Sequence, residues 1–293
     1  MAKLEGVITA MVTPFSEDGS VDVDAAKRLA RHLVDNGSHG VVVAGTTGES
    51  PTLSDAEDVE LVQAVKAEVG SESTVICGTC TNDTRHSEHL TQAAVEAGAD
   101  AVLVVTPYYN KPNRAGILAH YGAVAQAAGG TPVIVYNIPS RVVVNIEPDL
   151  LAELGRIDNI VAVKQANNEQ IDQVEELDVL AGNDDIFLRC LESGGAGGIL
   201  VASHVVGPQM RKIYDTVRAG DADRAAEIDS SIRPVYEALA VTTNPIPVKA
   251  AAEMLGLIPS ARMRLPMVEA DSEQRATIRA ALEAQGLLTQ SAA

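Results

Sequence analysis

The sequence predicts a (β/α)8 barrel of the TIM type, in which eight strand–helix units close on themselves, with a C-terminal helical extension. Three observations lead to this fold: short apolar runs recur about every thirty residues, each is followed by a helical pattern, and eight such units fit in about 220 residues. We expect the barrel at residues 1–222 and the helical region at residues 223–293. An open doubly wound sheet is the alternative, but no G-x-G-x-x-G motif follows the first run.

The expected strands share one composition. They are rich in β-branched residues, apolar throughout rather than alternating, and bounded by Gly, Pro and Asn, which is typical of strands buried on both faces of a parallel sheet. In chain order they are 7–13, 40–45, 74–77, 101–106, 132–136, 160–164, 178–182 and 198–202.

Amphipathic segments separate these strands. Between residues 23 and 36 apolar side chains recur at helical spacing, and Asn36-Gly37 supplies a stop signal. The segment from Ser54 to Glu57 has a capping-box pattern that starts the next helix. After residue 221 no strand pattern remains, and the expected helices are 221–240, 246–255 and 271–285.

The composition argues against several classes of function. A formal charge of -18 cannot neutralise a phosphate backbone, which argues against nucleic acid and against anionic membrane surfaces as partners. No uncharged apolar run approaches the roughly 20 residues needed to span a bilayer, and the N-terminus lacks the features of a secretion signal, so we expect a cytoplasmic protein. Cys77 and Cys80 form a single C-x-x-C, and the six histidines show no ligand spacing. We therefore expect a buried cysteine pair rather than a metal or redox site.

Lysine supplies the strongest candidate for catalysis. Active sites of such barrels lie at the C-terminal ends of the strands, and of seven lysines only Lys164 ends an apolar strand, 160–164. Burial there would lower its pKa and expose the neutral amine that attacks a ketone. The alternative is a lysine buried as half of an ion pair, but the residue that follows is Gln165 rather than a carboxylate. Lys164 is therefore predicted to form a Schiff base.

Polar side chains gather at other expected strand ends. Thr46 and Thr47 follow the second strand, where hydroxyls and backbone amides could hold a carboxylate. Tyr109 follows the fourth strand, Tyr136 ends the fifth and Arg141 follows the fifth. Phenols at these strand ends would be useful for proton transfer. A rim tyrosine that only fills space is the commoner explanation for each taken singly. Their convergence with the strand-end lysine favours an active site.

These motifs resemble those of the dihydrodipicolinate synthase/N-acetylneuraminate lyase family, which comprises class I aldolases on (β/α)8 barrels. The resemblance runs essentially end to end and is carried by 9–15, Thr46-Thr47, 107–110, Arg141 and 244–249. It is strongest to the branch that joins pyruvate to L-aspartate 4-semialdehyde in lysine biosynthesis. Sialic acid lyases usually have Ser-Thr at the first site and lack the arginine. The resemblance implies a lyase that needs no cofactor beyond its covalent imine with pyruvate.

The resemblance also implies catalytic roles. Lys164 would form the Schiff base, Tyr136 would shuttle protons at the imine, and Thr47 would relay protons between Tyr136 and Tyr109. The family's tyrosine at the position of Tyr109 enters the site of a neighbouring subunit. A tight dimer, usually paired into a tetramer, is therefore implied.

Further positions would bind the two substrates. Thr46, together with Thr47, would hold the carboxylate of pyruvate, and Arg141 would bind the carboxylate of the semialdehyde by a bidentate contact. Backbone groups at Gly182 and Ile199 match lesser substrate contacts.

Two other functions and one regulatory property remain to be weighed. The chain could be another pyruvate-dependent aldolase acting on a 2-keto-3-deoxy sugar acid, or a non-catalytic paralogue that senses a ligand. Among relatives inhibited by lysine, a glutamate often occupies the position of His86. Without that charge partner for the lysine ammonium, we predict weak lysine inhibition or none.

Overall fold

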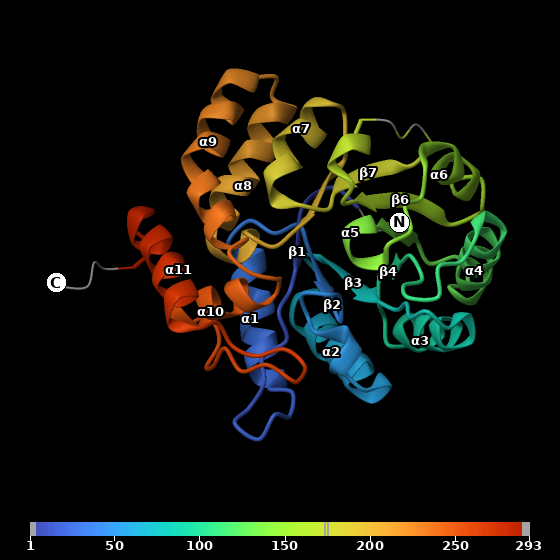
Figure 1. Cartoon of the computed structure of the whole chain (residues 1–293), viewed down its shortest axis with the longest axis horizontal. Coiled ribbons are helices and arrows are strands. Elements are labelled where there is room, and N and C mark those ends of the chain that lie inside the picture. The colour runs from blue at the N-terminus through green and yellow to red at the C-terminus, as the bar shows by residue number, and fades with distance from the viewer. Residues whose placement is uncertain (1–3, 173, 175, 289–293) are drawn as a thin grey trace.

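The computed structural model describes residues 4–172, 174 and 176–288, and in it eight parallel strands close into a barrel in chain order (Figure 1). The strands are β1 (Gly6–Ala10), β2 (Gly40–Val43), β3 (Thr74–Gly78), β4 (Ala101–Val105), β5 (Val133–Asn137), β6 (Ile160–Gln165), β7 (Asp178–Ala181) and β8 (Gly197–Leu200). The predicted (β/α)8 barrel is confirmed. The first and last expected strands are too long at their C-terminal ends, because the chain leaves the sheet there to form the loops of the barrel mouth.

Helices surround the barrel and continue beyond its last strand. They are α1 (Val23–Asp35), α2 (Asp55–Val69), α3 (Thr84–Glu96), α4 (Arg114–Ala127), α5 (Pro139–Val142), α6 (Pro148–Leu154), α7 (Phe187–Glu192), α8 (Ser203–Arg218), α9 (Ala222–Ala238), α10 (Ile246–Met254) and α11 (Ser272–Ala284). Short 3-10 turns are η1 (Ser50–Thr52), η2 (Asn168–Gln170) and η3 (Asp184–Ile186). The predicted capping box is present at α2, where Ser54 and Glu57 exchange hydrogen bonds.

The strands are buried on both faces, which explains why their sequences do not alternate between apolar and polar residues. In β4, Ala101 and Leu103 face the barrel interior, whereas Val102 and Val104 pack against the helices. Each strand therefore contributes to two apolar cores.

Glycine allows the barrel to close. Gly197 of β8 is the register partner of Gly6 of β1, and a Cβ at position 197 would lie 2.2 Å from the Gly6 carbonyl oxygen. The glycine-rich stretch 194–198 forms a turn only at its start, where Gly194 has φ +88°. Its last two glycines belong to the closing strand.

The C-terminal helices α9, α10 and α11 lie together on one side of the barrel, next to α8 and α1 (Figure 1). Each begins and ends within two residues of its prediction. The segment that joins α9 to α10 returns to the barrel mouth, where it contacts Thr47 and Arg141. The helical region therefore takes part in the site.

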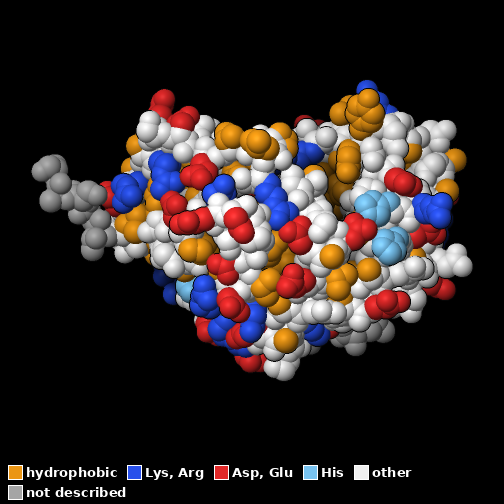
Figure 2. Space-filling view, turned by 90° about the horizontal axis from the view of Figure 1, so that it is seen from below, with side chains coloured by type: hydrophobic (Ala, Val, Ile, Leu, Met, Phe, Trp, Pro, Cys, Tyr) orange, Lys and Arg blue, Asp and Glu red, His pale blue; other side chains and the backbone are white. Residues whose placement is uncertain are grey.

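Acidic and basic side chains are interspersed on the face in Figure 2, with no broad basic patch. Within the described residues, no helix combines the length and the apolar character needed to cross a membrane.

Candidate active site

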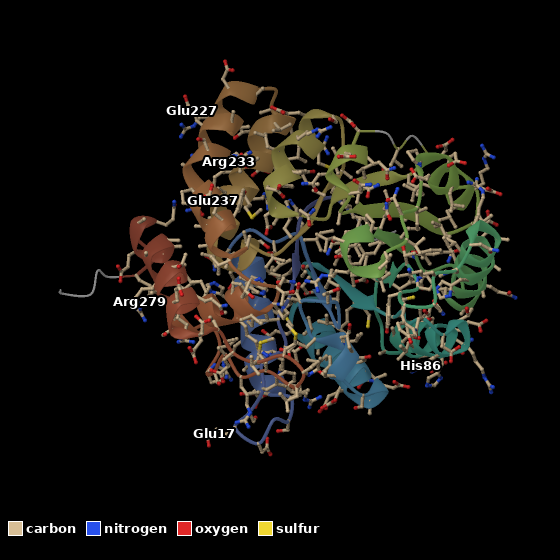
Figure 3. All side chains as sticks on the ribbon, viewed as in Figure 1. Glu17, His86, Glu227, Arg233, Glu237 and Arg279 are labelled. Carbon is tan, nitrogen blue, oxygen red and sulfur yellow. The ribbon has the colours of Figure 1, made fainter. Side chains whose placement is uncertain are left out.

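The loops at the carboxyl ends of the strands enclose a cavity of about 500 Å³. Its inner wall includes Thr46, Tyr136 and Lys164, and its outer wall is formed partly by α9. Figure 3 shows Arg233 and Glu237 on α9, and both line this outer part. The cavity therefore joins the barrel to the helical region.

Lys164 lies in the barrel mouth with only 5% of its surface exposed. It is the register partner of Tyr136 on the neighbouring strand, and its Nζ lies 4.2 Å from the centre of the Tyr136 ring. Among the described residues its ammonium has neither an ion pair nor a hydrogen bond. Burial lowers the pKa of Lys164 to about 7; the Asp184 carboxylate opposes the shift, and the Arg141 guanidinium adds to it.

The Tyr136 ring lies against this amine. Burial raises its pKa to about 12, against the opposing effects of the Arg141 guanidinium and a hydrogen bond with Thr46. The phenol is therefore neutral at pH 7 and lies beside both the lysine and a threonine hydroxyl. This arrangement is suited to moving a proton to or from a group bound at Lys164.

The two threonines have different partners. Thr46 bonds to Tyr136, whereas the buried Thr47 hydroxyl accepts a hydrogen bond of 2.9 Å from Nδ2 of Asn244. The loop that carries them is fixed by further hydrogen bonds, including one of 2.7 Å from the Thr13 hydroxyl to the Gly48 carbonyl. The hydroxyl bonded to Tyr136 is therefore that of Thr46, whereas the resemblance implied Thr47 as the relaying hydroxyl; that role stays a prediction.

Arg141 lies on α5 and lines the cavity. Its guanidinium donates a 3.0 Å hydrogen bond to the Asn244 carbonyl and a longer one of 3.4 Å to the Thr243 hydroxyl. Among the described residues, its hydrogen bonds use only one of its amino groups, so the other N–H groups stay available to an anion in the cavity.

Asp184, which was not among the predicted site residues, starts η3 and lines the cavity. Its Oδ1 accepts hydrogen bonds of 2.9 and 3.0 Å from the backbone N–H groups of Val201 and Ala202. Burial raises its pKa to about 6, while those N–H groups and Lys164 lower it. The position of Asp184 just after β7, at the mouth of the barrel, could have indicated a role in the site. Hydrophobic periodicity gives no such signal, because it identifies only apolar residues.

A second buried lysine differs from the first in one respect. Lys249, near the start of α10, is fully buried, and its Nζ lies 2.5 Å from Oε1 of Glu49. Burial lowers its pKa and Glu49 opposes this. Because its charge is paired, Lys249 lacks the free amine that nucleophilic attack requires.

Three of the predicted positions differ in how they relate to the cavity. Gly182 lines it, and a Cβ at this position would lie 2.8 Å from both the Ala166 Cβ and the Gln165 carbonyl oxygen. Ile199 is buried in the barrel interior and is not among the lining residues. Tyr109 is 88% exposed, has a left-handed backbone (φ 73°), and does not line the cavity of its own chain.

The cysteines and histidines form no cluster suited to a metal in residues 4–172, 174 and 176–288. Cys77 is buried and Cys80 is half-buried, and both are free thiols. Cys80 lies just after β3 and contacts Nε2 of His120 at 3.2 Å.

Comparison with known proteins agrees with this geometry. The family model of the dihydrodipicolinate synthetase family matches residues 3–285. The chain belongs to this family. A relative from Moorella thermoacetica named 4-hydroxy-tetrahydrodipicolinate synthase is 44% identical over 290 residues, which are 96% of this chain and 98% of the relative.

Solved structures from this synthetase family superpose closely. The synthase from Cyanidioschyzon merolae with lysine bound has a TM-score of 0.94 and 38% identity, and the match covers 98% of this chain and 100% of that one. The chloride-inhibited synthase from Acinetobacter baumannii, complexed with pyruvate, has a TM-score of 0.93 and 34% identity, with 97% and 100% covered. The prediction of an enzyme, a lyase of the synthase branch of this family, is confirmed.

Proposed function

We propose that the chain condenses pyruvate with L-aspartate 4-semialdehyde through an imine on Lys164, giving 4-hydroxy-tetrahydrodipicolinate. The observation that carries the proposal is a buried lysine with a pKa of about 7 and no counter-ion among the described residues, held against the Tyr136 phenol. About half of these amines are neutral at pH 7, against fewer than about one in a thousand for an ordinary lysine.

The first half of the reaction takes place on pyruvate. The neutral Nζ of Lys164 attacks the keto carbon, and the carbinolamine loses water to give a protonated imine. Loss of a methyl proton from this imine gives an enamine, with the imine nitrogen accepting the electron pair. Tyr136 is the group that moves these protons, and its hydrogen bond with Thr46 supports Thr46 as the relaying hydroxyl. Thr47 is then the threonine for the pyruvate carboxylate, which exchanges the two roles implied by the resemblance.

The second half joins the substrates. The enamine carbon attacks the aldehyde, and the amino group of the semialdehyde then displaces Lys164 by transimination, which closes the ring and frees the enzyme. Arg141 binds the carboxylate of the semialdehyde, because it lines the cavity and its planar guanidinium keeps N–H groups that bond to no other described residue. The imine itself withdraws electrons, so this chemistry requires neither a metal nor an organic cofactor.

The exposure of Tyr109 supports an oligomeric enzyme. A phenol that is 88% exposed on a left-handed backbone is poorly explained as part of its own chain's site. We propose that it completes the relay of a neighbouring subunit in a dimer, with dimers paired into a tetramer, in the cytoplasm.

Reductive trapping tests the proposed function. Incubation with pyruvate and borohydride should attach the reduced keto acid to Lys164, as located by mass spectrometry of peptides. Lys164→Ala should abolish the adduct, while Lys111→Ala, which changes an exposed loop lysine, should leave it unchanged. An adduct on no lysine, or on another lysine, would overturn the mechanism.

Substrate comparison separates the alternatives. A ligand-sensing paralogue would form no covalent adduct. An aldolase for 2-keto-3-deoxy sugar acids would turn over sugar aldehydes faster than the semialdehyde and would tolerate Arg141→Ala. The proposed synthase requires the opposite result in both assays.

A further inference from the structure

The link between α9 and α10 reaches both carboxylate-binding positions through one residue. Asn244 touches Thr47 with its side chain and Arg141 with its backbone carbonyl, at 2.9 Å and 3.0 Å. Thr47 and Asn244 are 197 residues apart, so only the folded chain joins them.

The side-chain contact fixes the direction in which Thr47 can donate. A hydroxyl has one O–H donor and two acceptor lone pairs. Nδ2 of Asn244 donates to Oγ1 of Thr47, so this bond occupies a lone pair and leaves the hydroxyl proton for another acceptor. Thr47 lines the cavity, so the carboxylate of a keto acid bound there is a suitable acceptor for this proton.

The backbone contact acts on the second carboxylate position. The Asn244 carbonyl and the Thr243 hydroxyl accept from one amino group of Arg141. This holds the guanidinium at the cavity rim and leaves its other donors free. The contact does not depend on the Asn244 side chain.

A buried ion pair fixes the two segments relative to each other. Glu49 lies two residues after Thr47, and its carboxylate binds the Lys249 ammonium at 2.5 Å on one oxygen and the Arg264 backbone N–H at 3.0 Å on the other. Lys249 lies five residues after Asn244, at the start of α10. The threonine loop is thus joined to the α9–α10 link by the Asn244–Thr47 bond and to the start of α10 by a fully buried ion pair.

Stability alone does not explain Asn244. Its Oδ1 is buried and accepts no hydrogen bond from the described residues. An unpaired buried acceptor is unfavourable, so this group adds nothing to the stability of the fold and calls for another explanation.

We propose that Asn244 is a positioning residue for both substrates: its amide sets the Thr47 hydroxyl as a donor to the pyruvate carboxylate, and its carbonyl orients Arg141 toward the semialdehyde. This inference rests on the proposed function. It predicts that the two contacts can be separated, because a side-chain substitution changes only the first.

Asn244→Asp and Asn244→Ala distinguish a positioning role from a structural role, because the two roles predict opposite rankings of these variants by their KM for pyruvate. Asn244→Asp is nearly isosteric, but a carboxylate facing Thr47 would accept its O–H and add a negative charge beside the bound pyruvate. Its KM for pyruvate should rise by at least about tenfold, whereas Asn244→Ala, which removes the bond without adding charge, should raise it by about threefold to fivefold. The KM for the semialdehyde should change by less than about twofold in both, because the backbone carbonyl remains.

The control for added charge is Asn113→Asp at the N-cap of α4. There the side chain accepts from the Gly116 N–H, which a carboxylate also does. Its kinetic constants should match those of the wild type. Circular dichroism and melting temperature would verify that each variant is folded.

The ranking of the two variants by KM for pyruvate decides between a positioning role and a structural role. A merely structural residue would tolerate the isosteric Asp better than Ala, and that order, or an unchanged KM for pyruvate in both, would overturn the inference. If Asn244→Asp does not fold, Asn244→Ala decides alone, since an unchanged KM for pyruvate would overturn the proposal. Failure of the wild type to trap pyruvate at Lys164 would instead overturn the proposed function.

Discussion

The pH dependence of imine formation follows directly from the burial of Lys164. With a pKa of about 7, the neutral amine makes up about 9% of the population at pH 6 and about 91% at pH 8. The rate of imine formation should therefore rise about tenfold over this interval and then level off. A lysine with its ordinary pKa would show a rise of about a hundredfold with no plateau.

A change to Asp184 tests the cause of this pKa. Its carboxylate favours the protonated form of Lys164 and so raises the lysine pKa against the effect of burial. With its own pKa near 6, Asp184 is ionised over most of the interval. Asp184→Asn removes the charge but keeps an oxygen for the N–H groups of Val201 and Ala202. The midpoint should move to lower pH by about half a unit to one unit.

The assay measures trapping with saturating pyruvate and cyanoborohydride at a series of pH values, with the modified fraction followed by mass spectrometry. Glu237→Gln is the matched control, because Glu237 lines the same cavity but is not among the charges that act on Lys164 or on Asp184. Its midpoint should stay at the wild-type value. A rate that keeps rising steeply above pH 8, or an upward shift in Asp184→Asn, would refute the reasoning.

Three other results are expected. Arg141→Lys should raise the KM for the semialdehyde at least about tenfold, because an ammonium cannot reproduce the planar fork, while pyruvate trapping should stay normal; equal loss of both would contradict this assignment. Lys249→Met should lower the free energy of unfolding by about 3–5 kcal/mol, since it leaves the buried Glu49 carboxylate without its counter-ion. Urea denaturation that shows a loss below about 1 kcal/mol would argue against this expectation. Free lysine should inhibit the enzyme weakly or not at all, because His86 is already bonded to Asp55 at 3.0 Å. Half-maximal inhibition by submillimolar lysine in a coupled assay would show this prediction to be wrong.

The barrel could be predicted because its signals are local. Each strand is a short apolar run, and burial on both faces is what makes such runs continuous, as β4 shows with Leu103 inside the barrel and Val102 outside it. Caps such as Ser54 with Glu57 also lie within one turn of the chain. Strand ends then placed Lys164 and Tyr136 at the mouth, and parallel register made them neighbours.

Contacts between distant segments could not be predicted in the same way. Nothing in the pattern around Asn244 indicates a bond to Thr47 or to Arg141, because no periodicity relates a link between two helices to a loop at the opposite end of the chain. That Thr46 bonds to Tyr136 and Thr47 to Asn244 could not be predicted for a similar reason. Adjacent residues on a loop point in different directions, and only the backbone course decides which hydroxyl meets the phenol.

The two buried lysines show why burial alone does not identify the nucleophile. Burial lowers the pKa of both, so desolvation cannot distinguish Lys164 from Lys249. The difference lies in the partner: Glu49 holds the ammonium of Lys249 as a cation at 2.5 Å, whereas Lys164 faces a neutral phenol and a more distant carboxylate. A paired lysine resists deprotonation and fixes the loop that carries Thr47, while an unpaired one releases its proton near neutral pH. The same residue type, desolvated in both places, thus positions the site in one and supplies its reactive amine in the other.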